Sequence, residues 1–556
     1  MLAKFYANLK PNKKREFLPL FAVTFFLVAV RFLYFGFEYF PQLDDYIQHH
    51  NYAPQGDFLY LFERLGLLAA RPLAGILDIT LWSWLWPCAI VGLLILSAMY
   101  AFAAVVFYKI FEKLIGASKF LIVVFALLPL GIEGTYWMSA STRIIPGIFF
   151  VSLSAYFFVC FMENGRKKEF ILALLFQFFT FCFYEQTAVL SCALNVIIGF
   201  TYVKKGDKRW LFSFGCLICA IAYFLVTSIH SDSPLYSGRT NVILPVTPYY
   251  FDNFLPNLLS QFKSAFLGGG YYTLVYGFIR GVMRMFNDGA IIYFILILLG
   301  CGAFGYLCIS KKGENVNSRY LLTLGVGILL VIAPLAPFFI IENPWFSFRG
   351  TVPSFLGIAL ICDLVIRLVS RNKKGAIAII SSVFSLIFCV CSVSEIADYK
   401  STYEADMRVV SKVASIAPEI KAEYPNESKV AIFNVDDRYV YELNSYYHEH
   451  IHGVTESDWA FTGAIRCYNN DVFEGITYVP ISLKDSPTYK NWEYSAKTIG
   501  SMNAVYVYDY NDNTIERLTV VPKDNTFEMY YPDGEKYGTV VEYDEGNGKY
   551  GVFVEE

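Results

Sequence analysis

Two adjacent carboxylates, Asp44 and Asp45, follow directly after the first long apolar run of this 556-residue chain. Neighbouring carboxylates repel each other, so the pKa of one is raised unless a cation or a metal lies close. Such a group suits a general base that takes a proton from a hydroxyl, or a ligand of a divalent cation that holds a phosphate. The structural alternative is a helix cap beside a solvated loop acid.

Further polar groups follow later apolar runs, where a charge near the bilayer usually faces a cavity and marks function. A guanidinium suits bidentate binding of phosphate, which makes two arginines candidates: Arg239 and Arg349. The candidates for binding a sugar or an acceptor are Glu185, Gln186, Glu133, Arg143 and Trp137. The alternative is that these arginines pair with nearby acids, Arg143 with Glu185 for example, and that Trp137 is an interfacial belt residue.

The composition indicates which class of protein holds these residues. Apolar residues make up 56 % of the chain and charged residues only 17 %, against about 45–50 % and 25 % in soluble domains. The apolar excess ends near Ser394, so we predict a membrane domain, 1–394, and a soluble domain, 395–556. The apolar excess indicates a lipid bilayer as partner. The net charge of −3 and the lack of any basic block longer than short Lys/Arg clusters indicate no nucleic-acid partner.

Apolar stretches long enough to cross a bilayer predict about eleven transmembrane helices, near 17–39, 86–108, 120–138, 144–162, 170–187, 188–203, 210–229, 288–310, 320–341, 350–369 and 375–394. Lys/Arg clusters fall on every second connection, which predicts a cytoplasmic N-terminus and an extracytoplasmic soluble domain. The long outer loops are then 40–85 and 230–287. Each contains amphipathic segments that we expect to lie in the interface, the second as a helix pair broken at 268–270.

After the membrane domain the pattern changes to that of a water-soluble fold. A polar helix over 403–422 precedes β-type runs at 429–435 and 503–508, which predict an α/β or α+β domain. The alternating His448, His450 and His452 have no second ligand cluster at a known spacing, so a polar strand edge or loop is favoured over a metal site.

The stretch Leu43-Asp44-Asp45-Tyr46, followed by Ala70-Arg71-Pro72-Leu73-Ala74-Gly75, resembles the GT-C membrane glycosyltransferases. Within that superfamily it is most similar to the O-antigen-modifying, serotype-converting glucosyltransferases, although Ala70 stands where that family usually has glycine. The resemblance implies a polytopic α-helical fold with its catalytic loops on the outer face of a bacterial cell membrane.

The implied activity is inverting transfer of a sugar, glucose or another hexose, from a polyprenyl-phosphate donor to a cell-envelope glycan acceptor. The resemblance implies Asp44 or Asp45 as the base, with Arg71 joining Arg239 and Arg349 on the leaving phosphate. A divalent cation, Mg²⁺ or Mn²⁺, is compatible with this chemistry but not required by it. A lipid-linked sugar flippase or secondary transporter and a polysaccharide polymerase or ligase are the alternatives.

Overall fold

The computed structural model describes residues 11–47, 71–203, 208–227, 241–309, 320–342, 344–435, 452–470, 472–481, 488–490, 499–524, 526–544 and 549–554. These residues form two compact units. The first contains the described residues up to Tyr39 and those from Arg71 to Ile396. The second contains residues 40–47 and the described residues from Ala397 onward.

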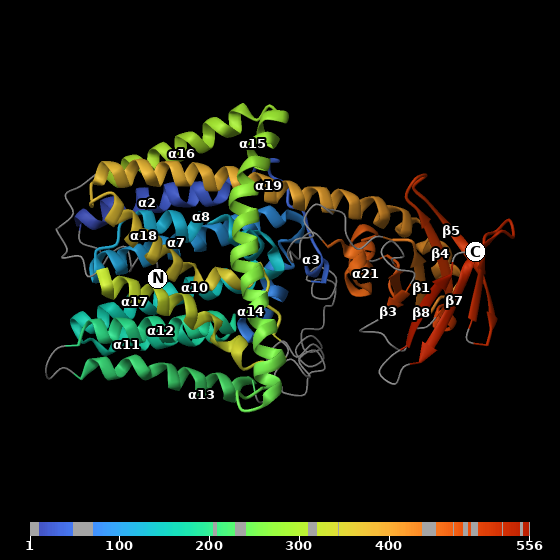
Figure 1. Ribbon diagram of the computed structural model, residues 1–556, viewed down its shortest axis with the longest axis horizontal. Helices are drawn as coiled ribbons and strands as arrows, with labels where there is room; N and C mark the ends of the chain where they lie inside the picture. Colours follow the sequence, from blue (N-terminus) through green and yellow to red (C-terminus); the bar gives the residue numbers. More distant parts are fainter. Residues whose placement is uncertain are drawn as a thin grey trace. The chain divides into compact units, whose positions relative to one another are not determined.

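The regular elements of the first unit's described part are helices (Figure 1), apart from one isolated β-bridge between Val242 and Ile341. Its α-helices are α2 (Pro11–Val30), α6 (Pro72–Leu77), α7 (Ala89–Ile115), α8 (Phe120–Leu127), α9 (Ile132–Tyr136), α10 (Met138–Asn164), α11 (Lys167–Phe181), α12 (Glu185–Thr201), α13 (Cys216–Thr227), α14 (Leu255–Lys263), α15 (Gly277–Asn287), α16 (Ile291–Ile309), α17 (Tyr320–Ile332), α18 (Phe355–Val369) and the part of α19 (Lys374–Ser415) up to Ile396. Short 3₁₀ and π segments join them: η2 (Asp78–Trp82), η3 (Trp86–Cys88), η4 (Pro129–Gly131), η5 (Arg209–Gly215), η7 (Tyr250–Phe254), η8 (Ser264–Gly268), η9 (Tyr271–Tyr276), η10 (Ala333–Phe339) and η11 (Phe348–Ser354).

Seven helical segments within the described ranges are long and apolar enough to cross a membrane: Trp86–Ile115, Met138–Asn164, Arg209–Thr227, Ile291–Ile309, Tyr320–Phe339, Phe348–Val369 and Lys374–Glu423. A helix needs about 20 mainly apolar residues to span the hydrocarbon core. The prediction of a multi-pass membrane protein is therefore confirmed. Shorter apolar helices occupy Glu16–Val30, Pro72–Trp82, Phe120–Tyr136 and Glu185–Thr201, so the count of about eleven spans stays a prediction.

Proline accounts for one of the short helices. Leu128 precedes Pro129 and has a ψ of 118°, outside the helical region, because the proline ring disfavours helical backbone in the residue before it. The predicted span at 120–138 is therefore divided into α8, η4 and α9. This break leaves the polar groups of α9 at a helix end within an apolar unit.

One helical run crosses the direction of its neighbours. The backbone is helical without interruption from residue 248 to 287, and in Figure 1 this run, labelled α14 and α15, lies across the direction of α16 and α19. The predicted break at 268–270 is wrong, because Gly269 continues the helix and permits close packing. A Cβ at Gly269 would lie 2.4 Å from the ring of Phe348, closer than atoms approach in proteins.

Helix α19 continues through the predicted end of the last span. It has 42 residues, which corresponds to a length of about 63 Å. No glycine or proline follows Gly375 until Pro418, so nothing local interrupts the helix between its apolar half and its polar half. The predicted separate helix at 403–422 is in fact the end of α19 followed by α20 (Ala417–Glu423).

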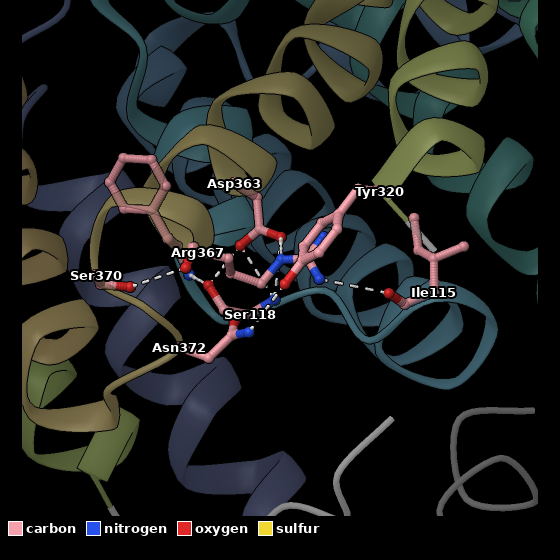
Figure 2. A network of polar contacts seen from close by, with 8 residues as sticks. Ile115, Ser118, Tyr320, Asp363, Arg367, Ser370 and Asn372 are labelled. Carbon is pink, nitrogen blue, oxygen red and sulfur yellow. Dashed lines mark hydrogen bonds and ion pairs between the residues drawn. The ribbon is translucent and has the colours of Figure 1, made fainter. Parts of the chain in front are cut away.

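A buried ion pair fixes the connection between α7 and α8 to helix α18 (Figure 2). The carboxylate of Asp363 lies 2.8 Å from Nε of Arg367 and accepts the backbone N–H of Ser118 at 3.0 Å. Arg367 also approaches the carbonyl oxygen of Ile115 at 3.5 Å. The side chains of Asp363 and Arg367 are 0 % and 3 % exposed, so each charge depends on the other.

The second unit is built on a mixed sheet with the strand order β2-β1-β4-β5-β6-β7-β8-β3. The strands are β1 (Ser428–Phe433), β2 (Ile476–Ile481), β3 (Thr488–Lys490), β4 (Ala504–Asp509), β5 (Thr514–Lys523), β6 (Thr526–Tyr530), β7 (Lys536–Asp544) and β8 (Lys549–Val554). Strand β1 is parallel to β2 and β4, and the remaining pairs are antiparallel. The predicted C-terminal domain of helices and strands is confirmed at this level.

The described core cluster of the second unit is formed mainly by strand residues, among them Phe433, Val507 and Val540. Residues Val430 to Phe433 of β1 are fully buried, as expected for a strand with parallel neighbours on both sides. Helices α20 and α21 (Asp458–Tyr468) pack against β2, and α21 also packs against α3 (Asp44–Ile47). A Cβ at Gly463 of α21 would lie 3.2 Å from Cβ of Tyr46. Glycine therefore allows α3 to approach closely.

Candidate functional site

Arg71 and Glu185 form a bidentate ion pair in the first unit. Nε and Nη2 of Arg71 donate to the two carboxylate oxygens of Glu185 at 3.0 and 2.9 Å. Arg71 immediately precedes Pro72 at the start of α6, and the carbonyl oxygen of Cys182 accepts the backbone N–H groups of Leu73 and Ala74 at 3.2 and 3.3 Å. These bonds hold the start of α6 against the turn between α11 and α12, which carries Glu185.

Arg143 was predicted as the structural partner of Glu185, and this pairing is wrong. Arg143 instead donates from Nη2 to Asp78 at 3.0 Å and to the carbonyl oxygen of Ser139. Asp78 is 1 % exposed at the start of η2. It was not among the predicted site residues, although an acid within the apolar stretch after Arg71 was a signal that could have found it.

Glu133, Arg349 and Trp137 form a third group. Glu133 is buried in α9 and accepts the backbone N–H of Arg349 at 3.1 Å. Arg349 lies in the first turn of η11, where backbone N–H groups have no partner within the helix and favour an anion. The guanidinium carbon of Arg349 lies 5.1 Å from the ring centre of Trp137, within the range of a cation–π contact.

Gln186 ties α12 to the same short helix. Its Nε2 donates to the carbonyl oxygen of Gly350 at 2.9 Å, while its buried Oε1 has no hydrogen-bond partner among the described residues. The close approach of α9 to η11 depends on Gly134, where a Cβ would lie 2.8 Å from Val352 and 3.2 Å from the backbone of Arg349. The structure therefore brings the predicted groups of α9, α12 and η11 into direct contact.

These contacts arise where helices are short or broken. Pro72 begins α6, Pro129 begins η4, and Pro353 lies within η11. Helix ends carry backbone groups without intrahelical partners, and Glu133 satisfies one of them at the start of η11. We conclude that the apolar first unit contains a polar cluster consisting of Arg71, Asp78, Glu133, Trp137, Arg143, Glu185, Gln186 and Arg349.

Asp44 and Asp45 belong to the second unit and differ in exposure. Asp45 is fully buried, and its carboxylate accepts the backbone N–H of Gln42 at 3.0 Å, a capping contact at the start of α3. Asp44 is half-buried at the first position of the same helix. The next residue, Tyr46, is buried beside Asp406, and burial together with that carboxylate raises the pKa of Tyr46 well above its usual range.

Further predictions concern Arg239, the histidines and a metal site. Arg239, predicted to bind phosphate, lies outside the described residues, as do His448 and His450. Within the described ranges, no three His, Cys, Asp or Glu side chains converge as metal ligands would. No chemical step is therefore derived through Mg²⁺ or Mn²⁺.

Comparison with known proteins adds no family to this description. No protein-family model matches the chain, and no curated protein is detectably similar to it.

Proposed function

We propose that this chain is a membrane glycosyltransferase that transfers a hexose from polyprenyl phosphate to a cell-envelope glycan, on the outer face of a bacterial membrane. One observation carries the proposal: the polar cluster in the apolar unit combines groups suited to phosphate with groups suited to sugar. The guanidinium of Arg71 presents a fork that matches phosphate oxygens. The carboxylate of Glu185 and the unpartnered Oε1 of Gln186 are acceptors for sugar hydroxyls.

The transverse helix supports a lipid-linked donor. The helical run 248–287 lies across the direction of α16 and α19 (Figure 1), as an interfacial helix does relative to membrane spans. Its exposed side chains include large apolar residues, among them Leu267, Val275, Phe278, Val282 and Phe286. In this proposal the exposed apolar face contacts the polyprenyl chain and the surrounding lipid at the level of the headgroups.

The chemical step would be an in-line displacement at the anomeric carbon. A carboxylate takes the proton of the acceptor hydroxyl, the hydroxyl oxygen forms the new glycosidic bond, and the bond to the lipid phosphate breaks, so that the carbon is inverted. We assign the base to Asp44, because it is the more accessible of the two acids. Asp45 is the positioning residue, since its carboxylate holds the backbone at Gln42. The arginines would neutralise the departing phosphate.

Transfer of labelled hexose from polyprenyl phosphate to envelope glycan, measured in membranes, tests the proposal. Asp44→Asn should reduce transfer by about 10²–10⁴-fold, as expected for loss of a general base. Asp512→Asn makes the same chemical change at an exposed acid of the second unit and should leave transfer unchanged. Full transfer by Asp44→Asn at matched expression would refute the assigned base. No transfer by the wild-type chain from any lipid-linked hexose would favour a flippase or a polymerase.

A further inference from the structure

The Arg71–Glu185 pair differs from the other arginine pair of the polar cluster in its accessibility. The side chains of Arg71 and Glu185 are 31 % and 42 % exposed, whereas those of Arg143 and Asp78 are 21 % and 1 % exposed. An arriving anion can therefore reach the first pair from the surface of the unit. In the second pair, the carboxylate is enclosed by protein.

The edge of Arg71 that Glu185 occupies is the edge that a phosphate would use. Nε and Nη2 donate in parallel to two oxygens of one carboxylate, and phosphate oxygens accept the same pair of donors in the same geometry. The guanidinium carbon also lies 4.8 Å from the ring centre of Tyr184. Because that contact uses the face of the guanidinium, the edge can change partners while Arg71 stays in place.

We infer that Glu185 is an internal competitor for the phosphate site on Arg71. The phosphate of the donor displaces the carboxylate from Nε and Nη2, and the released carboxylate accepts hydrogen bonds from the hydroxyls of the attached sugar. This inference rests on the proposed function and adds a regulation of the same site. In the donor complex, the sugar hydroxyls replace Arg71 as hydrogen-bond donors to Glu185. The bare polyprenyl phosphate left after transfer has no sugar and cannot replace them.

The exchange therefore distinguishes donor from product. Bare polyprenyl phosphate must break the Arg71–Glu185 pair without offering a sugar hydroxyl in return, so it binds less tightly than the donor. When the sugar has left, Glu185 competes for Arg71 again and promotes release of the lipid phosphate. The carboxylate thereby links loss of the sugar to loss of affinity for the carrier.

Binding of a bare polyprenyl monophosphate to the purified full-length chain in detergent tests this exchange, with the uncharged polyprenol as the reference ligand. Glu185→Gln removes the competitor and should tighten phosphate binding about two- to fivefold, the range expected for a partly exposed ion pair. Arg71→Ala should weaken it. Glu163→Gln makes the same change at a partly exposed pair outside the polar cluster, Lys113–Glu163, whose side chains are 44 % and 32 % exposed, and should leave phosphate binding unchanged.

A double-mutant cycle separates exchange from simple charge repulsion. If Glu185 competes for Arg71, then Glu185→Gln gives no gain in the Arg71→Ala background. An equal gain in that background would overturn the exchange, because repulsion of the phosphate by Glu185 does not require Arg71. If Arg71→Ala fails to fold, Arg71→Lys keeps the charge, loses the fork and should reduce the gain from Glu185→Gln.

The remaining outcomes distinguish this inference from the proposed function. Unchanged phosphate affinity in Glu185→Gln, with a wild-type chain that still prefers the phosphate to the polyprenol, would overturn the exchange alone. Equal binding of the phosphate and the polyprenol by the wild-type chain would overturn the donor class itself, and the exchange with it.

Discussion

The buried pair Asp363–Arg367 offers a sharp test of the packing between α7, α8 and α18. Replacing Asp363 by Asn keeps an oxygen that can accept the backbone N–H of Ser118, but it leaves the guanidinium of Arg367 without its carboxylate. Since the side chain of Arg367 is 3 % exposed, water cannot replace the lost partner. The substitution therefore isolates the cost of a buried, uncompensated charge.

Removing one partner of a buried ion pair costs about 3–5 kcal/mol. At roughly 2 °C of midpoint per kcal/mol for a large domain, Asp363→Asn should lower the unfolding midpoint by about 6–10 °C. The double variant Asp363→Asn/Arg367→Met removes both charges and retains an apolar side chain of similar length. It should recover most of the loss, because no charge then remains buried.

The buried thiols of the first unit make the measurement direct. A thiol-reactive dye in detergent reports unfolding as buried cysteines become accessible, namely Cys182, Cys219, Cys301, Cys389 and Cys391. The control is Arg166→Met, since Arg166 is 74 % exposed and lies 3.9 Å from Glu169, a pair that contributes little. A midpoint for Asp363→Asn within about 1 °C of the wild type, or a double variant no better than the single one, would refute the reasoning.

Two further predictions concern other parts of the chain. Gly281→Ala should destabilise the protein by about 1–3 kcal/mol, because the new Cβ would lie 2.1 Å from the carbonyl oxygen of Val390. At Gly302 no atom lies within 4 Å of the position of a new Cβ, so Gly302→Ala should be neutral or slightly stabilising in the same thermal assay. A hydrogen bond from Arg517 lowers the pKa of Glu423 from 4.5 to about 2. The pair therefore stabilises the second unit fully above about pH 4.5, and this stabilisation is lost as the pH falls towards 2. Calorimetry over that range should show a shallower loss of stability in Glu423→Gln, and identical slopes would contradict the assignment.

The parts of this fold that depend on local pattern could be predicted from the sequence. Long apolar stretches predict membrane helices because each helix satisfies its own backbone in lipid. The runs at 429–435 and 503–508 became β1 and β4, since alternating and β-branched residues bounded by turn residues are typical of strands. Both signals are contained within a few neighbouring residues.

Pairings between distant residues could not be predicted in the same way. Arg71 and Glu185 are 114 residues apart, and which acid meets which arginine depends on how α6 packs on the turn after α11. The sequence suggested Arg143 as the partner of Glu185, whereas the structure pairs Arg143 with Asp78 and Glu185 with Arg71. Likewise, the glycines at 268–270 predicted a break, whereas in the structure Gly269 lies within the helix and allows the ring of Phe348 to pack closely.

The second unit combines two segments that are far apart in the sequence, and this limits when it can fold during synthesis. Its small helix α3 (Asp44–Ile47) belongs to the segment 40–47, whereas α21 and the sheet lie beyond Ala397. The first strand and α21 begin about 380 and 410 residues after α3, so a ribosome adding 5–20 residues per second makes them only after roughly 20–80 s. Throughout that interval α3 has emerged without the surface on which it packs. Folding of the second unit therefore cannot finish until the whole membrane unit has been made, and a fragment that begins at Ala397 would lack a piece of its own core.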